Sequence, residues 1–189
     1  MTTLLTATPG QTIGPFFGYA LPFDRGNELV PPGSPNAIQF SGVVSDGDGR
    51  PVPDALLEIW QADAEGRIPN SVGSLHRDGW TFTGWGRAST DDGGRYGFST
   101  VVPGATCQGA APFIMITVFA RGLLNRLFTR AYIPGEWLAH DPLLASLSAE
   151  RRDTLVASWD GTGLRFDIQL QDAPGKPETV FLRYPGHQR

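Results

Sequence analysis

Residues 38–61 read IQFSGVVSDGDGRPVPDALLEIWQ, and this stretch decides the fold class. Two apolar segments, 38–45 and 55–61, are rich in the β-branched and aromatic residues that favour strands. Between them lies Asp46-Gly47-Asp48-Gly49, whose Asp-Gly pairs supply the positive φ angles of a tight turn. The pattern predicts two strands joined as a hairpin.

The same punctuation continues along the chain. The 189 residues include 24 Gly and 16 Pro, which separate short apolar segments at intervals typical of a sandwich and disfavour a helical fold. We therefore expect an all-β protein, a two-sheet antiparallel β-sandwich large enough to bury a core without disulfides. The candidate strands are 38–45, 55–61, 80–87, 94–101, 113–120, 127–132, 164–171 and 179–184.

Two segments depart from this pattern. Asp141-Pro142 is suited to cap and start a helix, and apolar residues recur at roughly helical spacing from Leu143 to Val156. This predicts one short, broken helical segment. Residues 1–36 carry little regular pattern, so we expect an extended N-terminal arm that contacts a partner chain, followed by the sandwich domain at 37–189.

Composition excludes several classes of function. The net charge of -4 offers no basic surface for nucleic acid. No apolar run approaches the ~20 residues of a membrane span, and residues 1–9 lack a secretory signal, so we expect no membrane partner and a cytoplasmic protein. The single cysteine, Cys107, excludes an internal disulfide framework, and we expect it to be a small packing residue.

The residues alone indicate no autonomous active site. His76, His140 and His187 are scattered, without the spacing of a metal site. The aspartates at 46 and 48 lack the later glutamate of a calcium loop. The chain has neither a phosphate-binding glycine loop nor a G-x-S-x-G elbow. We therefore expect no metal ligand and no catalytic residue in this chain.

Three segments are similar to the intradiol ring-cleavage dioxygenases. They are TPGQTIGPF at 8–16, ALLEIWQAD at 55–63 and FIMITVFARG at 113–122. They occur in the family's order, with support from other parts of the chain, whereas 22–36 and 66–79 match poorly. In combination they resemble the iron-free chain of the family's heteromeric enzymes.

The resemblance implies where the iron is held. Catalytic chains of the family bind Fe(III) with two tyrosines and with two histidines in an H-x-H, a spacing that puts both imidazoles on one face of a strand. Phe113 and Met115 occupy the matching histidine positions, Ala105 occupies one tyrosine position, and the other falls near Ser74. The resemblance therefore implies that Fe(III) is held by the partner β subunit and not by this chain.

It also implies an active site at the interface of the two subunits. The resemblance implies that this chain contributes four substrate-binding residues to that site. Thr12 donates a hydrogen bond, Gly14 and Pro15 allow a close and rigid backbone approach, and Arg121 places a positive charge near the substrate carboxylate. Arg130 is the alternative carboxylate partner. The alternatives for the other positions are a simple turn of the arm and an interface ion pair for Arg121.

The implied reaction is cleavage of the small aromatic substrate 3,4-dihydroxybenzoate by O₂ to 3-carboxy-cis,cis-muconate, performed by the complex and not by this chain alone. A self-sufficient catechol dioxygenase needs four iron ligands that the sequence does not supply. The alternative from another class is a non-enzymatic ligand- or carbohydrate-binding sandwich, because VSDGDGRPVPDA at 44–55 also resembles such modules.

Overall fold

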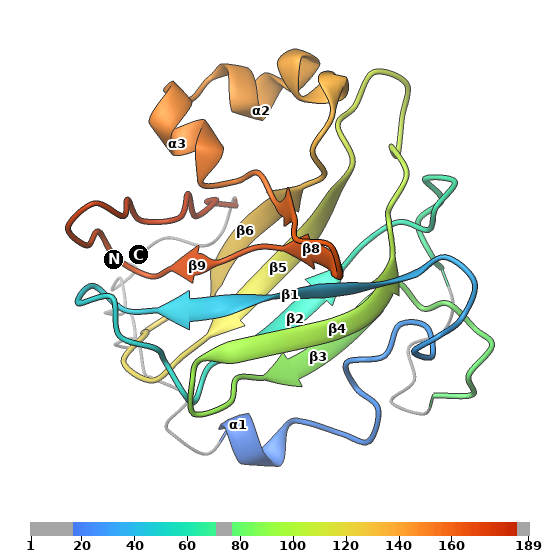
Figure 1. Ribbon diagram of the computed structural model, residues 1–189, viewed down its shortest axis with the longest axis horizontal. Coiled ribbons are helices and arrows are strands. Elements are labelled where there is room, and N and C mark those ends of the chain that lie inside the picture. Colours follow the sequence, from blue (N-terminus) through green and yellow to red (C-terminus); the bar gives the residue numbers. More distant parts are fainter. Residues whose placement is uncertain (1–16, 71–76, 185–189) are drawn as a thin grey trace, which may run out of the picture.

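The computed structural model describes residues 17–70 and 77–184, which form two β-sheets packed face to face (Figure 1). One sheet has the strand order β4-β1-β8-β7, with β9 also paired to β1, and the other has the order β3-β2-β5-β6. The predicted all-β sandwich is confirmed. None of the helices in the described ranges is long and apolar enough to cross a membrane.

The strands and helices have the following bounds. The strands are β1 (Ala37–Ser45), β2 (Leu56–Trp60), β3 (Trp85–Ser89), β4 (Arg95–Val101), β5 (Phe113–Phe119), β6 (Leu127–Tyr132), β7 (Ser158–Trp159), β8 (Gly163–Arg165) and β9 (Ile168–Gln169). The helices are α1 (Phe17–Ala20), the 3₁₀ helix η1 (Glu136–His140), α2 (Pro142–Ala145) and α3 (Ala149–Asp153).

The predicted hairpin between the first two strands is wrong. The Asp46 carboxylate accepts hydrogen bonds from the amides of Asp48 and Arg50, both at 2.9 Å, and so forms the expected turn. The turn reverses the chain only as far as Val52, whose amide donates to the Val44 carbonyl at 2.9 Å. The chain then crosses to the other sheet and begins β2, so β1 and β2 face each other across the core.

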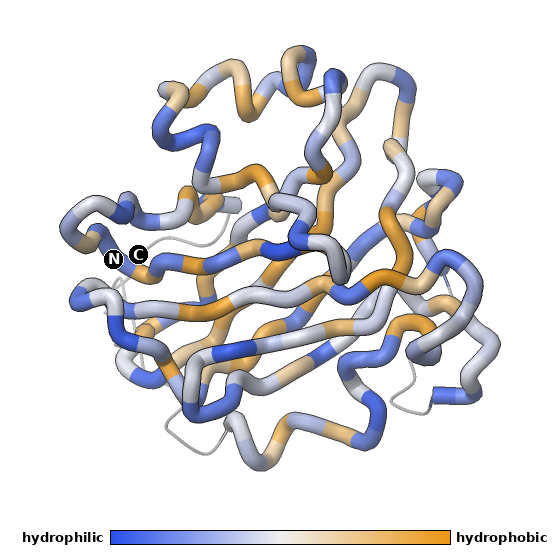
Figure 2. The backbone as a smooth tube through the Cα atoms, viewed as in Figure 1, coloured by the Kyte–Doolittle hydropathy of each residue, from blue (hydrophilic) through white to orange (hydrophobic). Residues whose placement is uncertain are grey.

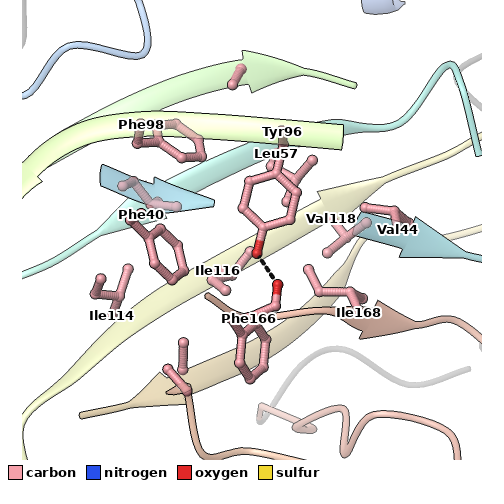
Figure 3. Packing of buried hydrophobic residues seen from close by; sticks show 14 of the residues in the cluster. Phe40, Val44, Leu57, Tyr96, Phe98, Ile114, Ile116, Val118, Phe166 and Ile168 are labelled. Carbon is pink, nitrogen blue, oxygen red and sulfur yellow. Dashed lines mark hydrogen bonds between the residues drawn. The ribbon is translucent and has the colours of Figure 1, made fainter. Parts of the chain in front are cut away.

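The first sheet is not purely antiparallel, which corrects a second expectation. β1 pairs in parallel with β8 and with β9, and the predicted strand 164–171 is broken between them at Phe166 and Asp167. Gly42 lies opposite the break, where a Cβ would overlap the Phe166 carbonyl. The Tyr96 hydroxyl donates to this carbonyl oxygen at 2.5 Å (Figure 3). Glycine and tyrosine together therefore accommodate the interruption.

The main core lies between the sheets, and a smaller one lies under the helices. Apolar residues (orange in Figure 2) alternate with more polar ones along the strands. The apolar side chains that point inward fill the space between the sheets. Figure 3 labels Phe40, Val44, Leu57, Tyr96, Phe98, Ile114, Ile116, Val118, Phe166 and Ile168. Beyond β6, Leu144 and Leu155 from the helical region pack with Tyr132 and Val180 in the second cluster.

Other predictions are confirmed in outline and corrected in detail. The broken helical segment is present as α2 and α3, and Asp141 caps α2 through its contacts with the amides of Leu143 and Leu144. The strand predicted at 80–87 begins only at Trp85. The segment 179–184 forms no strand, although Leu182 donates from its amide to the Phe128 carbonyl at 2.7 Å.

Two expectations concern the arm and the cysteine. The arm's residues 1–16 lie outside the described residues. Its later part lies on its own sandwich, because the amides of Leu29 and Val30 both donate to the Ser99 carbonyl. Contact of the arm with a partner chain stays a prediction. Cys107 is exposed, so the expectation that it packs in the interior is wrong.

Candidate functional site

A row of large side chains crosses the outer face of the second sheet. Trp85, Trp60, Met115 and Arg130 are successive register partners on β3, β2, β5 and β6. The residues that alternate with them, such as Ile114, are buried in the core, so the row faces away from it. Trp60, the last residue of the interior strand β2, is 48% exposed, which is unusual for an indole.

Of the two positions matched to the family's iron-binding histidines, one lies in this row and the other lies beside it. Phe113 and Met115 share the outer face of β5. The Phe113 ring packs against Tyr132, with ring centroids 5.6 Å apart. The guanidinium carbon of Arg130 lies 4.2 Å from the Phe113 ring centroid. An aromatic ring, a thioether and a cation therefore stand where the resemblance places a metal site.

These residues do not fit a ferric ion. Phe113 has no donor atom, the Met115 thioether is a soft ligand for a hard trivalent metal, and Arg130 adds positive charge. Ala105, at a matched tyrosine position, is exposed and has no donor in its side chain. Ser74, near the other, lies outside the described residues. Over 17–70 and 77–184 there is no group of three or more His, Cys, Asp or Glu that could hold a metal ion.

Arg130 is engaged within its own chain. Its Nη1 donates to the Tyr132 hydroxyl at 3.0 Å, and that hydroxyl donates to Asp141 Oδ1 at 3.2 Å. Burial acts to lower the pKa of the Arg130 guanidinium, but the phenols of Tyr132 and Tyr184 outweigh it and the pKa is raised. Burial raises the pKa of Tyr132, which the neighbouring guanidinium only partly offsets. The arginine is therefore a fixed cation at this site.

Arg121 lies at the other end of β5. The strand runs from Phe113 to Phe119, roughly 20 Å at about 3.3 Å per residue, and Arg121 follows it. Its Nε pairs with Asp54 Oδ2 at 3.2 Å, with 64% of the Arg121 side chain and 17% of the Asp54 side chain exposed. The fold thus separates Arg121 from the position matched to the metal in this chain.

Arg121 borders a shallow cleft of about 290 Å³, which is also lined by Asp54, Leu123 and Leu170. Among residues 17–70 and 77–184, the buried Asp54 Oδ1 has no hydrogen-bond partner. Of the two candidate arginines, Arg121 is the more exposed, whereas Arg130 is half-buried and hydrogen-bonded to Tyr132. The alternative role for Arg121 was an ion pair with an acid at a subunit interface. Arg121 does form an ion pair, but its partner Asp54 belongs to the same chain.

The remaining candidate residues, Thr12, Gly14 and Pro15, lie outside the described residues. The arm enters the described part at α1, beside the edge strand β3. There Ser89 Oγ donates to the Gly18 carbonyl at 3.0 Å, and Arg87 Nη1 donates to the Leu21 carbonyl at 2.8 Å. Residues 1–16 therefore precede a segment that is anchored at that edge.

Sequence reasoning missed two residues of interest, Trp60 and Asp54. Both lie in or next to the ALLEIWQAD segment, and the outward register of Trp60 was readable from its alternation with Ile59. The partnership of Asp54 with Arg121 was not readable, because 67 residues separate them in the chain and only the pairing of β2 with β5 brings them together.

Comparison with known proteins decides the family. A family profile described as "Dioxygenase" matches residues 13–172. The chain is 39% identical over 199 residues to the protocatechuate 3,4-dioxygenase alpha chain of Burkholderia cepacia, covering 95% of this chain and 98% of that one. This chain belongs to the intradiol ring-cleavage dioxygenase family. The resemblance found in its three sequence segments is thereby confirmed.

The chain also matches two further members of the family. The protocatechuate 3,4-dioxygenase beta chain of Burkholderia cepacia is 36% identical over 156 residues, which cover 74% of this chain and 66% of the other. The solved structure of catechol 1,2-dioxygenase from Acinetobacter sp. ADP1 matches with a TM-score of 0.57 and 20% identity, over 84% of this chain and 60% of the other. At that identity the structural match shows the shared fold alone.

Proposed function

We propose that this chain is the iron-free α subunit of a protocatechuate 3,4-dioxygenase and acts only in complex with an iron-bearing β subunit. The observation that carries the proposal is the replacement of the matched metal ligands by Phe113 and Met115, with Arg130 stacked beside them. Similarity to a protocatechuate 3,4-dioxygenase alpha chain over nearly its whole length supports the choice of subunit. The 98% coverage of that enzyme chain disfavours a separate ligand- or carbohydrate-binding module.

The reaction of the complex is the addition of both atoms of O₂ to 3,4-dihydroxybenzoate, with cleavage of the ring bond between its two hydroxyl-bearing carbons. The product is 3-carboxy-cis,cis-muconate. Ferric iron on the β subunit supplies activation of the bound catechol. This chain supplies binding groups, and none of its own residues transfers a proton or an electron.

Arg121 is the described residue that fits such a binding role. Its guanidinium presents a planar set of donors that matches a carboxylate. Asp54 engages Nε at 3.2 Å and holds the side chain at the mouth of the cleft. The Nη donors of the same guanidinium are the groups that bind the carboxylate on the aromatic ring of the substrate. The ion pair thus supports a preformed position for the arginine.

The arm supplies the other contacts in this proposal. Thr12 donates a hydrogen bond, and Gly14 and Pro15 allow a close approach of backbone to the aromatic ring. Residues 1–16 precede α1, and an extended segment of that length, at roughly 3.3 Å per residue, is long enough to reach a neighbouring chain. The exposed indole of Trp60 supports an interface on the same molecule, because large aromatic side chains are enriched in such surfaces.

Separate and joint expression of the two subunits tests the proposal. Expressed alone in iron-rich medium, this chain should contain no stoichiometric iron by elemental analysis and should consume no O₂ with 3,4-dihydroxybenzoate. Expressed with the β subunit, it should co-elute in size-exclusion chromatography as an active complex whose iron follows the β subunit. The β subunit alone is the control. An iron-replete, active assembly of this chain by itself would refute the assignment.

A further inference from the structure

Arg130 lies beside Phe113 and Met115, the two residues that do not fit a ferric ion. Arg130 and Met115 are register partners on β6 and β5, and Tyr132 and Phe113 are the next outward pair. These four side chains therefore surround one spot on the outer face of the sheet. The guanidinium carbon lies 4.2 Å from the Phe113 ring centroid, within the range of a cation-π contact.

This cation is part of a connected set of interactions. Arg130 Nη1 donates to the Tyr132 hydroxyl, which donates to Asp141 Oδ1, and the same carboxylate oxygen accepts from the amides of Leu143 and Leu144. Asp141 is buried, and its contacts cap α2. The arginine is therefore linked to the helical cover of β6 through two side chains.

We propose that Arg130 replaces the metal in this chain: its guanidinium occupies the space and supplies the positive charge at the position of residues 113 and 115, so that this part of the sandwich folds without iron and does not take up a metal ion. In a two-subunit enzyme this confines the iron to the other subunit. The inference uses family membership and the geometry around Arg130, and it does not depend on the proposed pairing or on catalysis.

Electrostatics gives the size of the expected effect. A metal ion held by imidazoles at 113 and 115 would lie roughly 4–6 Å from the guanidinium. Even at the dielectric constant of water, repulsion between a divalent ion and a unit charge at that distance weakens binding about 10- to 30-fold. Restoring the histidines should therefore not be sufficient to restore a metal site.

The test is a metal titration of the isolated chain with Zn²⁺ as the probe. Four variants are compared: Phe113→His/Met115→His with Arg130 retained, and the same pair with Arg130→Met, with Arg130→Lys, or with Arg95→Met. Arg95 is exposed on the opposite sheet and is the matched control for removal of a charge. Isothermal titration calorimetry measures the affinity, and circular dichroism checks that each variant is folded.

Adding Arg130→Met to the histidine pair should tighten Zn²⁺ binding at least tenfold, whereas adding Arg130→Lys or Arg95→Met should leave the affinity close to that of the pair alone. Equal affinity with and without Arg130, including no binding by either, overturns the metal-exclusion role. In the otherwise unchanged chain, Arg130→Met should lower Tm by about 5 °C through loss of the cation-π contact and the hydrogen bond to Tyr132. An unchanged Tm overturns the structural role.

Discussion

Replacing Arg121 with alanine in the two-subunit complex separates the two roles open to this side chain. If Arg121 only forms an exposed ion pair with Asp54, the structure limits its value, because 64% of the arginine side chain is in contact with solvent. Such pairs contribute at most about 1 kcal/mol to stability. Arg121→Ala would then lower Tm by no more than about 4 °C and leave turnover unchanged.

If Arg121 binds the substrate carboxylate, the cost appears in kinetics. A charge-assisted hydrogen bond to a partly desolvated carboxylate contributes about 1.5–3 kcal/mol, which corresponds to a loss of roughly 10- to 150-fold in kcat/KM. Arg121→Lys should recover only part of this loss, because an ammonium group cannot make the planar two-point contact. Asp54→Asn keeps the positive charge but loosens its anchor, so its effect should be smaller than that of Arg121→Ala.

The assay is O₂ consumption by the assembled complex with 3,4-dihydroxybenzoate and, in parallel, with catechol, which lacks the carboxylate. Arg121→Ala should reduce kcat/KM for 3,4-dihydroxybenzoate by the stated factor and leave kcat/KM for catechol unchanged. Iron content and subunit assembly are measured on the same samples. Equal losses on both substrates, or no loss on either in an intact complex, would refute a carboxylate-binding role.

Three further predictions concern the interrupted sheet. Tyr96→Phe should destabilise the chain by about 1–3 kcal/mol in urea unfolding, because the buried Phe166 carbonyl loses its hydroxyl donor; an unchanged midpoint would contradict this. Gly42→Ala should cost at least about 2 kcal/mol, since the new Cβ overlaps the same carbonyl. Gly109→Ala, where no described residue lies within 4 Å of the new Cβ but φ is +78°, should cost only about 1 kcal/mol. Burial raises the pKa of Tyr96 well above its usual value, so above pH ~10 this tyrosine ionises only in the unfolded state. The free energy of unfolding should therefore fall by up to about 1.4 kcal/mol per pH unit above pH ~10, and the fall should be less steep in Tyr96→Phe.

Much of the local structure and the family could be predicted from the sequence. Alternating apolar residues located five of the eight candidate strands to within one residue, because a strand with one buried face imposes a period of two on its own side chains. The sequence also shows directly that no metal-binding histidine stands at positions 113 and 115, because these residues are Phe and Met. The three motif segments identified the family because they occur in the family's order.

Strand partners and side-chain contacts were decided by the tertiary structure. The Asp46 turn specifies a local reversal, but it does not specify that the chain then leaves for the other sheet, and the parallel pairing of β1 with β8 joins segments more than 120 residues apart. The same holds for Asp54 with Arg121 and for Arg130 above Phe113. Periodicity reports which face of an element is buried, whereas the partner on that face is selected by packing of the whole chain, so these contacts were visible only once the sandwich was assembled.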